Sequence, residues 1–177
     1  MNTGYDLDAA VRKVPDFPRE GILFYDITSI LMNPPAFHYC ISSMIDRYRS
    51  ARLDAVAAVE SRGFLFAAPL AHELRLPLLL VRKAGKLPGA TVSRTYDLEY
   101  GSDTVEMHRE DLGSGQNIVV VDDLIATGGT VRATADLIAQ AGSTVHEVFS
   151  VIGLPFLGYL DRLAPIAVHT LLDYHGE

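Results

Sequence analysis

Two adjacent acids and two adjacent glycines lie in one short segment, where together they could hold a phosphorylated sugar. Residues 118–130 read IVVVDDLIATGGT, so Asp122 and Asp123 follow a β-branched run and precede a turn with Gly128 and Gly129. Glycines let backbone amides approach a phosphate closely, and the N-terminus of a following helix adds partial positive charge. The acids can accept hydrogen bonds from ribose hydroxyls. The segment therefore predicts a site for ribose 5-phosphate, against the alternative of an ordinary strand, turn and helix.

Cationic residues follow two other strand-like runs and could bind a second anionic group. The string ESRG at residues 60–63 follows the apolar run 55–59, and VRKAGKLPG occupies residues 81–89. Because the carboxyl ends of parallel strands face one crevice, we expect these cations to meet a pyrophosphate beside the sugar. The cations are Arg62, Arg82, Lys83 and Lys86. A helix-capping arginine and a solvated charge cluster are the alternative interpretations.

The elements that must position these residues alternate between strand-like and helix-like apolar patterns. This alternation is typical of an α/β fold, here a mainly parallel five-stranded sheet flanked by helices. Strands are expected at residues 55–59, 78–81, 118–121, 145–152 and 167–172. Helices are expected at about residues 7–14, 35–50, 64–74 and 130–141. Gly142 should end the last helix, and Cys40 should lie in the core rather than act as a nucleophile.

Residues 85–111 interrupt this rhythm, because they are polar and rich in glycine and proline. Apolar and polar residues alternate over 92–100, which predicts a β-hairpin. A long insertion of this kind is often a lid over an active site, although a purely structural hairpin is the alternative. We expect a single domain with a small N-terminal hood at about 1–33, a core at about 34–177 and a flexible lid at about 85–111.

The composition excludes several classes of protein. The net charge is -7, which argues against binding nucleic acid or a membrane surface through bulk electrostatics. A single cysteine excludes a disulfide framework, and the six histidines show no metal-binding spacing. No leader and no run of about 18 apolar residues is present, so we expect a cytoplasmic protein.

Four strings along most of the chain carry a family resemblance: ESRGFLFAAPLA, VRKAGKLPG, YDLEYG and IVVVDDLIATGGT. In this order and spacing they resemble the type I phosphoribosyltransferases, and in particular the adenine phosphoribosyltransferases. The resemblance implies the type I phosphoribosyltransferase fold and a pentosyltransferase reaction of purine salvage. In that reaction adenine and 5-phosphoribosyl 1-pyrophosphate (PRPP) give AMP and pyrophosphate. It also implies Mg²⁺ as cofactor and a homodimer, with no nucleic-acid or membrane partner.

The resemblance also implies roles for individual residues. The 5′-phosphate loop would be Ala126, Thr127, Gly128, Gly129 and Thr130, and the ribose acids Asp122 and Asp123. The pyrophosphate contacts would be Arg62, Arg82, Lys83 and Lys86. Glu99 would be the catalytic carboxylate of the lid. Adenine would lie under Leu23, Phe24 and Tyr25, with the Phe24 ring stacked on it, although many relatives carry a basic residue in place of Tyr25. Mg²⁺ would be held mainly by the pyrophosphate and water, without dedicated protein ligands.

Two alternatives remain at the level of sequence. One is a phosphoribosyltransferase for another purine base: hypoxanthine, guanine or xanthine. The other is a non-catalytic regulator that senses PRPP. Such regulators usually add a DNA-binding domain or a basic surface, whereas this chain has neither and retains Glu99.

Overall fold

A seven-stranded sheet forms the centre of the computed structural model, which describes residues 5–97 and 101–176. The strand order is β5-β6-β4-β3-β7-β8-β9, and the last five strands of that order run parallel. These strands are β3 (Ala55–Val59), β4 (Leu78–Lys83), β7 (Asn117–Ile125), β8 (Thr144–Gly153) and β9 (Val168–Asp173). The α/β class and the five expected parallel strands are confirmed, but the sheet has seven strands rather than five, because two further strands, β5 and β6, join it in antiparallel pairing.

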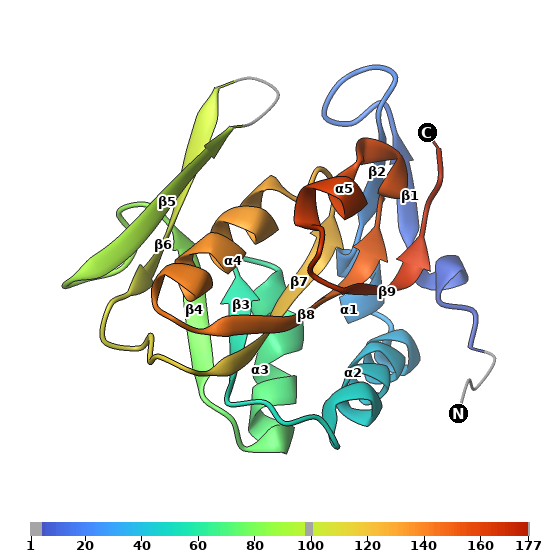
Figure 1. Cartoon of the computed structure of the whole chain (residues 1–177). Helices are drawn as coiled ribbons and strands as arrows, with labels where there is room; N and C mark the ends of the chain where they lie inside the picture. Colours follow the sequence, from blue (N-terminus) through green and yellow to red (C-terminus); the bar gives the residue numbers. More distant parts are fainter. Residues whose placement is uncertain (1–4, 98–100, 177) are drawn as a thin grey trace.

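Helices cover both faces of the sheet (Figure 1). The helices that share a core cluster with Val56 and Ala58 are α2 (Pro34–Tyr48) and α3 (Gly63–Leu74). Those that share one with Ala57 and Val59 are α4 (Gly129–Gln140) and α5 (Tyr159–Leu163). Successive β3 side chains thus point to opposite faces of the sheet and belong to two separate apolar layers. Cys40 on α2 is completely buried, as expected, and in the described ranges no helix is long and apolar enough to cross a membrane.

The N-terminal segment differs from its prediction. Instead of a helix over residues 7–14, the chain forms a short 3-10 turn, η1 (Asp8–Ala10), followed by β1 (Arg12–Pro15). This strand pairs antiparallel with β2 (Leu23–Asp26), and the short helix α1 (Thr28–Leu31) follows. Long-range pairing with β2 stabilises an extended backbone that the local apolar spacing did not indicate. The two strands form a small separate sheet at the position expected for the hood.

The predicted hairpin is present and extends the central sheet at one edge. Its strands are β5 (Thr91–Asp97) and β6 (Ser102–His108), which pair antiparallel. Strand β6 in turn pairs with β4 at Arg82 and Lys83. In Figure 1 the hairpin projects on one side of α4, and the two-stranded hood stands on the other. The hairpin therefore connects directly to the strand that carries the predicted pyrophosphate cations.

Candidate active site

The two acids and the glycine turn lie together at the end of β7 and the start of α4. The sequence pattern predicted a strand that ends before the acids. Strand β7 instead continues through both acids to Ile125. Gly128 then caps α4 with a φ of 76°, in the left-handed region that favours glycine. A cavity of about 120 Å³ is lined by Asp122 and residues 124–131. Asp122 and the glycine turn therefore line one concave surface.

The glycines of this turn also make room for neighbouring side chains. A Cβ on Gly128 would lie 3.1 Å from the Cβ of Tyr159, which belongs to α5. A Cβ on Gly129 would lie 3.0 Å from Cδ2 of Tyr96 on β5 and 3.1 Å from Nη1 of Arg162 on α5. Residues 126–130, called the phosphate loop below, are therefore packed between the hairpin and α5.

Sequence reasoning missed these packing partners for different reasons. Tyr96 lies in the predicted hairpin, and its hydroxyl accepts a 2.8 Å hydrogen bond from Oγ1 of Thr130. Its alternating position was visible in the sequence, but its partner was not. Tyr159 and Arg162 lie on α5, a short helix that no pattern in the sequence predicted.

The acid pair is buried more deeply than a simple surface site would require. The exposed fraction is 8% for Asp122 and 3% for Asp123. Burial, and then repulsion from Asp123, raises the pKa of Asp122 well above its ordinary value. Burial also raises the pKa of Asp123, against the opposing effect of Arg62, whose Nε lies 3.0 Å from Oδ2. The arrangement holds two carboxylates side by side with one cation to offset them.

The cations predicted for pyrophosphate are arranged around acids. Arg82 Nε and Lys86 Nζ each lie 3.1 Å from a carboxylate oxygen of Glu60, and the Lys83 amide donates to the same group at 2.8 Å. The Lys83 ammonium instead pairs with Asp103 at 3.0 Å. Glu60 is a residue that sequence reasoning missed, although it stands directly after β3 in the ESRG string. The structure thus brings Arg82 and Lys86 together through Glu60 and directs the Lys83 side chain to the hairpin.

A Glu60→Gln substitution should reveal this cluster through the pH dependence of stability. Burial would raise the pKa of Glu60, but hydrogen bonds from Arg82, the Lys83 amide and Lys86 outweigh it and hold the pKa at about 2. A depressed pKa gives stability above the ordinary value of 4.5 that is lost as the pH falls toward 2. The variant should unfold about 1–2 kcal/mol more easily at pH 7, as expected for lost charged hydrogen bonds.

Urea unfolding between pH 2 and pH 7 measures this effect. The free energies of unfolding of wild type and Glu60→Gln should converge as the pH falls below about 4.5. The matched control is Glu110→Gln, which changes an exposed glutamate without a described partner. A difference that stays constant over the whole range would contradict the role assigned to Glu60.

The three hood residues do not face one cavity. Leu23 and Tyr25 line a cavity of about 200 Å³, whereas the Phe24 ring meets Phe17 edge-on at a centroid distance of 5.0 Å. Tyr25 is only 4% exposed, and its ring stacks on Tyr174 at 4.0 Å. The remaining residues lining this cavity are Arg19, Ile22, Leu154, Phe156 and Leu157. The ring of Tyr25 is thus committed to packing against Tyr174.

Glu99, the predicted catalytic residue, lies outside the described residues. The flanking strands end at Asp97 and resume at Ser102. Residues 5–97 and 101–176 contain no cluster of three or more His, Cys, Asp or Glu side chains suited to a metal ion.

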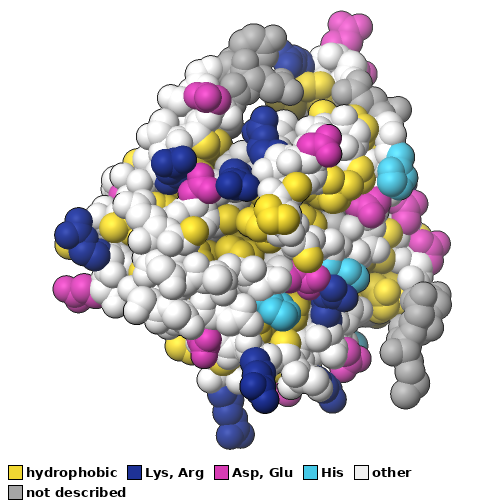
Figure 2. Space-filling model, in the orientation of Figure 1, with side chains coloured by type: hydrophobic (Ala, Val, Ile, Leu, Met, Phe, Trp, Pro, Cys, Tyr) yellow, Lys and Arg dark blue, Asp and Glu magenta, His cyan; other side chains and the backbone are white. Residues whose placement is uncertain are grey.

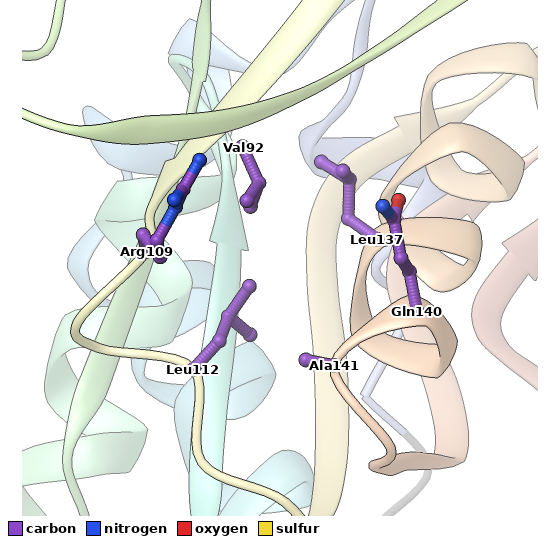
Figure 3. A pocket seen from close by; sticks show the side chains of 6 residues that line it. All are labelled: Val92, Arg109, Leu112, Leu137, Gln140 and Ala141. Carbon is purple, nitrogen blue, oxygen red and sulfur yellow. The ribbon is translucent and has the colours of Figure 1, made fainter.

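A larger cavity, of about 330 Å³, lies elsewhere between the hairpin and α4 (Figure 3). Leu137, Gln140 and Ala141 line it from the C-terminal end of α4, opposite Val92 and Arg109. The negative end of the helix dipole disfavours an anion there, so the phosphate loop is the better phosphate site. On the face shown in Figure 2, basic and acidic side chains are interspersed, in keeping with cations that are mostly paired.

Comparison with known proteins identifies the family. Residues 26–153 match the family model described as phosphoribosyl transferase domain. The adenine phosphoribosyltransferase of Treponema denticola is 52% identical over 171 residues, which cover 97% of this chain and 90% of that protein. The enzyme of the same name from Haemophilus influenzae is 45% identical, with both chains covered completely.

Solved structures agree with these relatives. The adenine phosphoribosyltransferase of Thermoanaerobacter pseudethanolicus superimposes with a TM-score of 0.91 at 41% identity, covering 95% of this chain and 98% of that one. The Saccharomyces cerevisiae enzyme, solved with an imino-altritol bisphosphate and adenine, gives 0.87 at 39% identity, with 94% and 96% covered. The chain therefore belongs to the phosphoribosyltransferase family and, within it, to the adenine phosphoribosyltransferases.

Proposed function

We propose that this protein transfers the phosphoribosyl group of PRPP to adenine, giving AMP and pyrophosphate in purine salvage. The observation that carries the proposal is the cavity that Asp122 shares with the phosphate loop. An acceptor for ribose hydroxyls and a turn rich in backbone donors line it together. The family to which the chain belongs supplies the identity of the base.

The acids and the phosphate loop suit the two ends of ribose 5-phosphate. Asp122 lines the cavity and can accept a hydrogen bond from a ribose hydroxyl, whereas Oδ2 of Asp123 is buried and lies 3.0 Å from Nε of Arg62. Backbone amides of residues 126–130 and the hydroxyls of Thr127 and Thr130 would hold the 5′-phosphate. As pyrophosphate departs, positive charge develops on the ribose, and a nearby carboxylate pair stabilises it.

The cation cluster suits the leaving group. Arg62, Arg82, Lys83 and Lys86 surround the edge of the sheet beside the acids, each held by a carboxylate partner. Pyrophosphate carries more negative charge than one carboxylate, so it can compete for these cations when the substrate binds. The side chains would then exchange partners rather than create a new site.

Adenine would lie between the hood and the phosphate loop. Leu23, Phe24 and Tyr25 would approach it from β2, with the Phe24 ring stacking and the backbone of β2 reading the edge of the base. The buried Tyr25 ring leaves only its backbone for this contact. Glu99 on the lid would hold or transfer a proton of the purine, a contribution typically worth about 10²- to 10⁴-fold in rate.

Mg²⁺ is part of the proposal, and the residues present fit it. Magnesium keeps several water ligands and is commonly bound by one or two carboxylates plus substrate phosphates. The pyrophosphate and water would supply most of its ligands, and Asp122 and Asp123 would lie beside the ribose without forming a dedicated metal site. The ion would neutralise charge on the departing pyrophosphate.

A homodimer in a reducing, cytoplasmic setting completes the proposal. Met32 is 81% exposed and Leu65 is 44% exposed, so apolar surface is available for a second copy. The single cysteine, Cys40, is buried and free, which suits a compartment where disulfides do not form.

The proposal predicts that the purified protein releases pyrophosphate only when PRPP, Mg²⁺ and adenine are all present. Pyrophosphate is measured with a coupled phosphate assay, and AMP by chromatography. Chelation with EDTA should stop turnover, because the pyrophosphate would leave without its counterion, and added Mg²⁺ should restore it. Absence of turnover with adenine under these conditions would overturn the proposal.

A further inference from the structure

The guanidinium of Arg162 lies against the first residue of α4, beside the phosphate loop. Its Nη1 atom is 3.1 Å from the position that a Cβ on Gly129 would occupy. Because glycine has no side chain, this cation approaches the backbone of the helix N-terminus directly. Arg162 did not emerge from the sequence, and none of the predicted pyrophosphate contacts includes it.

Among residues 5–97 and 101–176, Arg162 has no anionic partner. Other cations near the site form ion pairs: Arg62–Asp123, Arg82–Glu60, Lys86–Glu60, Lys83–Asp103, Arg94–Asp136 and Arg132–Asp136. In the described part of the chain, the guanidinium of Arg162 makes neither a hydrogen bond nor an ion pair. An exposed arginine held at a helix N-terminus without a carboxylate presents its donors to an anion from solution.

The short helix that carries Arg162 is fixed to the body of the protein. Tyr159 is 2% exposed, and its Cβ lies 3.1 Å from the position that a Cβ on Gly128 would occupy. Its hydroxyl donates to Oδ1 of Asp173 at 3.3 Å, and the same oxygen accepts a 2.8 Å bond from Thr170. These contacts hold the backbone of α5 beside the phosphate loop, so only side-chain torsions of Arg162 need to change when an anion arrives.

The phosphate loop itself supplies no full positive charge. Its backbone amides offer donors and a partial charge, and Arg132, in the first turn of α4, is paired with Asp136 at 3.0 Å. A 5′-phosphate carries nearly two negative charges. Of the two buried acids, Asp122 lines the same cavity and Asp123 follows it in the chain. We propose that the guanidinium of Arg162 binds the 5′-phosphate of PRPP and of AMP. This inference rests on the function proposed above.

Calorimetric titration with AMP and with adenosine tests the assignment, because the two ligands differ only by the phosphate. Arg162→Gln should weaken AMP binding about 10- to 100-fold, as expected for a lost charged hydrogen bond, and leave adenosine binding unchanged. Arg162→Lys, which keeps the charge without the planar fork, should recover part of the loss. Arg52→Gln is the matched control. It removes an exposed arginine just before β3, at the N-terminal ends of the parallel strands and so away from the phosphate loop.

The outcomes separate this inference from the proposed function. Equal AMP affinity in wild type and Arg162→Gln would overturn the inference, while adenine turnover by wild type would leave the function intact. An equal loss of AMP and adenosine affinity would overturn it as well, because the effect would then not be specific to phosphate. Wild type that neither binds AMP nor uses adenine would overturn both.

Discussion

Replacing Asp122 with asparagine should weaken PRPP binding and at the same time stabilise the fold at neutral pH. Loss of a charged acceptor for the ribose hydroxyls should raise the KM for PRPP about 10- to 100-fold, from the usual contribution of such hydrogen bonds. Asparagine retains an oxygen that can accept the 2.8 Å bond from the Asp123 amide. The local backbone arrangement should therefore survive the change.

The expected gain in stability follows from the raised pKa of Asp122. Burial and the neighbouring Asp123 raise it in the folded state, so the folded protein binds a proton more tightly than the unfolded chain. Stability from such a group is present at low pH and is lost as the pH rises above the ordinary carboxyl range. Asparagine does not titrate, so the variant should gain roughly 1–3 kcal/mol at pH 7, because the cost of desolvating a buried charged carboxylate is removed.

Urea unfolding at pH 4 and pH 7, with steady-state kinetics at pH 7, measures both effects of Asp122→Asn. The difference in the free energy of unfolding should be small at the lower pH and larger at the higher one. Asp111→Asn makes the same atom exchange at an exposed position and should change neither quantity. A variant with unchanged KM, or one destabilised at pH 7, would show that the acid pair is structural.

Glu99→Ala should lower kcat by about 100-fold or more while PRPP binding stays nearly unchanged. The proposed role concerns a proton of the purine, so the loss appears in the chemical step rather than in the affinity for the other substrate. The lid hairpin reaches the phosphate loop through Tyr96, which lies three residues before Glu99 and accepts the hydrogen bond from Thr130. Tyr96 therefore places the described part of the hairpin beside the phosphate loop.

Single-turnover kinetics separates chemistry from product release in this experiment. The control is Glu110→Ala, an exposed glutamate two residues past the end of β6. Glu99→Gln should restore little activity, because an amide cannot exchange the proton. If Glu99→Ala kept the full wild-type kcat, the catalytic carboxylate would have to lie elsewhere.

The parts of the fold that local patterns determine could be predicted. The β-branched or small apolar runs at β3 and β7 form buried parallel strands, and α4 is followed by Gly142, which has a φ of 79°. Binary patterning succeeds here because both faces of these strands are covered by helices. The prediction of a helix in the hood was wrong because local patterning does not determine this segment. Strand β1 is stabilised by a partner strand, β2, that begins eight residues after its end.

The site was predictable in its residue types but not in its partners. The sequence placed Arg62, Arg82 and the acid pair at strand ends that topology does bring to one edge of the sheet. It gave no sign that Glu60 gathers two of the cations, because such an ion pair joins residues more than twenty positions apart. Likewise, Tyr159 and Arg162 reach the phosphate loop only through the return of the chain after β8.

The selectivity of the site for its base is tested most directly by competition. Wild-type protein with limiting PRPP and Mg²⁺ is offered equal concentrations of adenine, hypoxanthine, guanine and xanthine, and the nucleotides formed are separated by chromatography. AMP should be the dominant product, and pyrophosphate should appear in equal amount. IMP, GMP or XMP as the main product, or consumption of PRPP without any nucleotide, would contradict it.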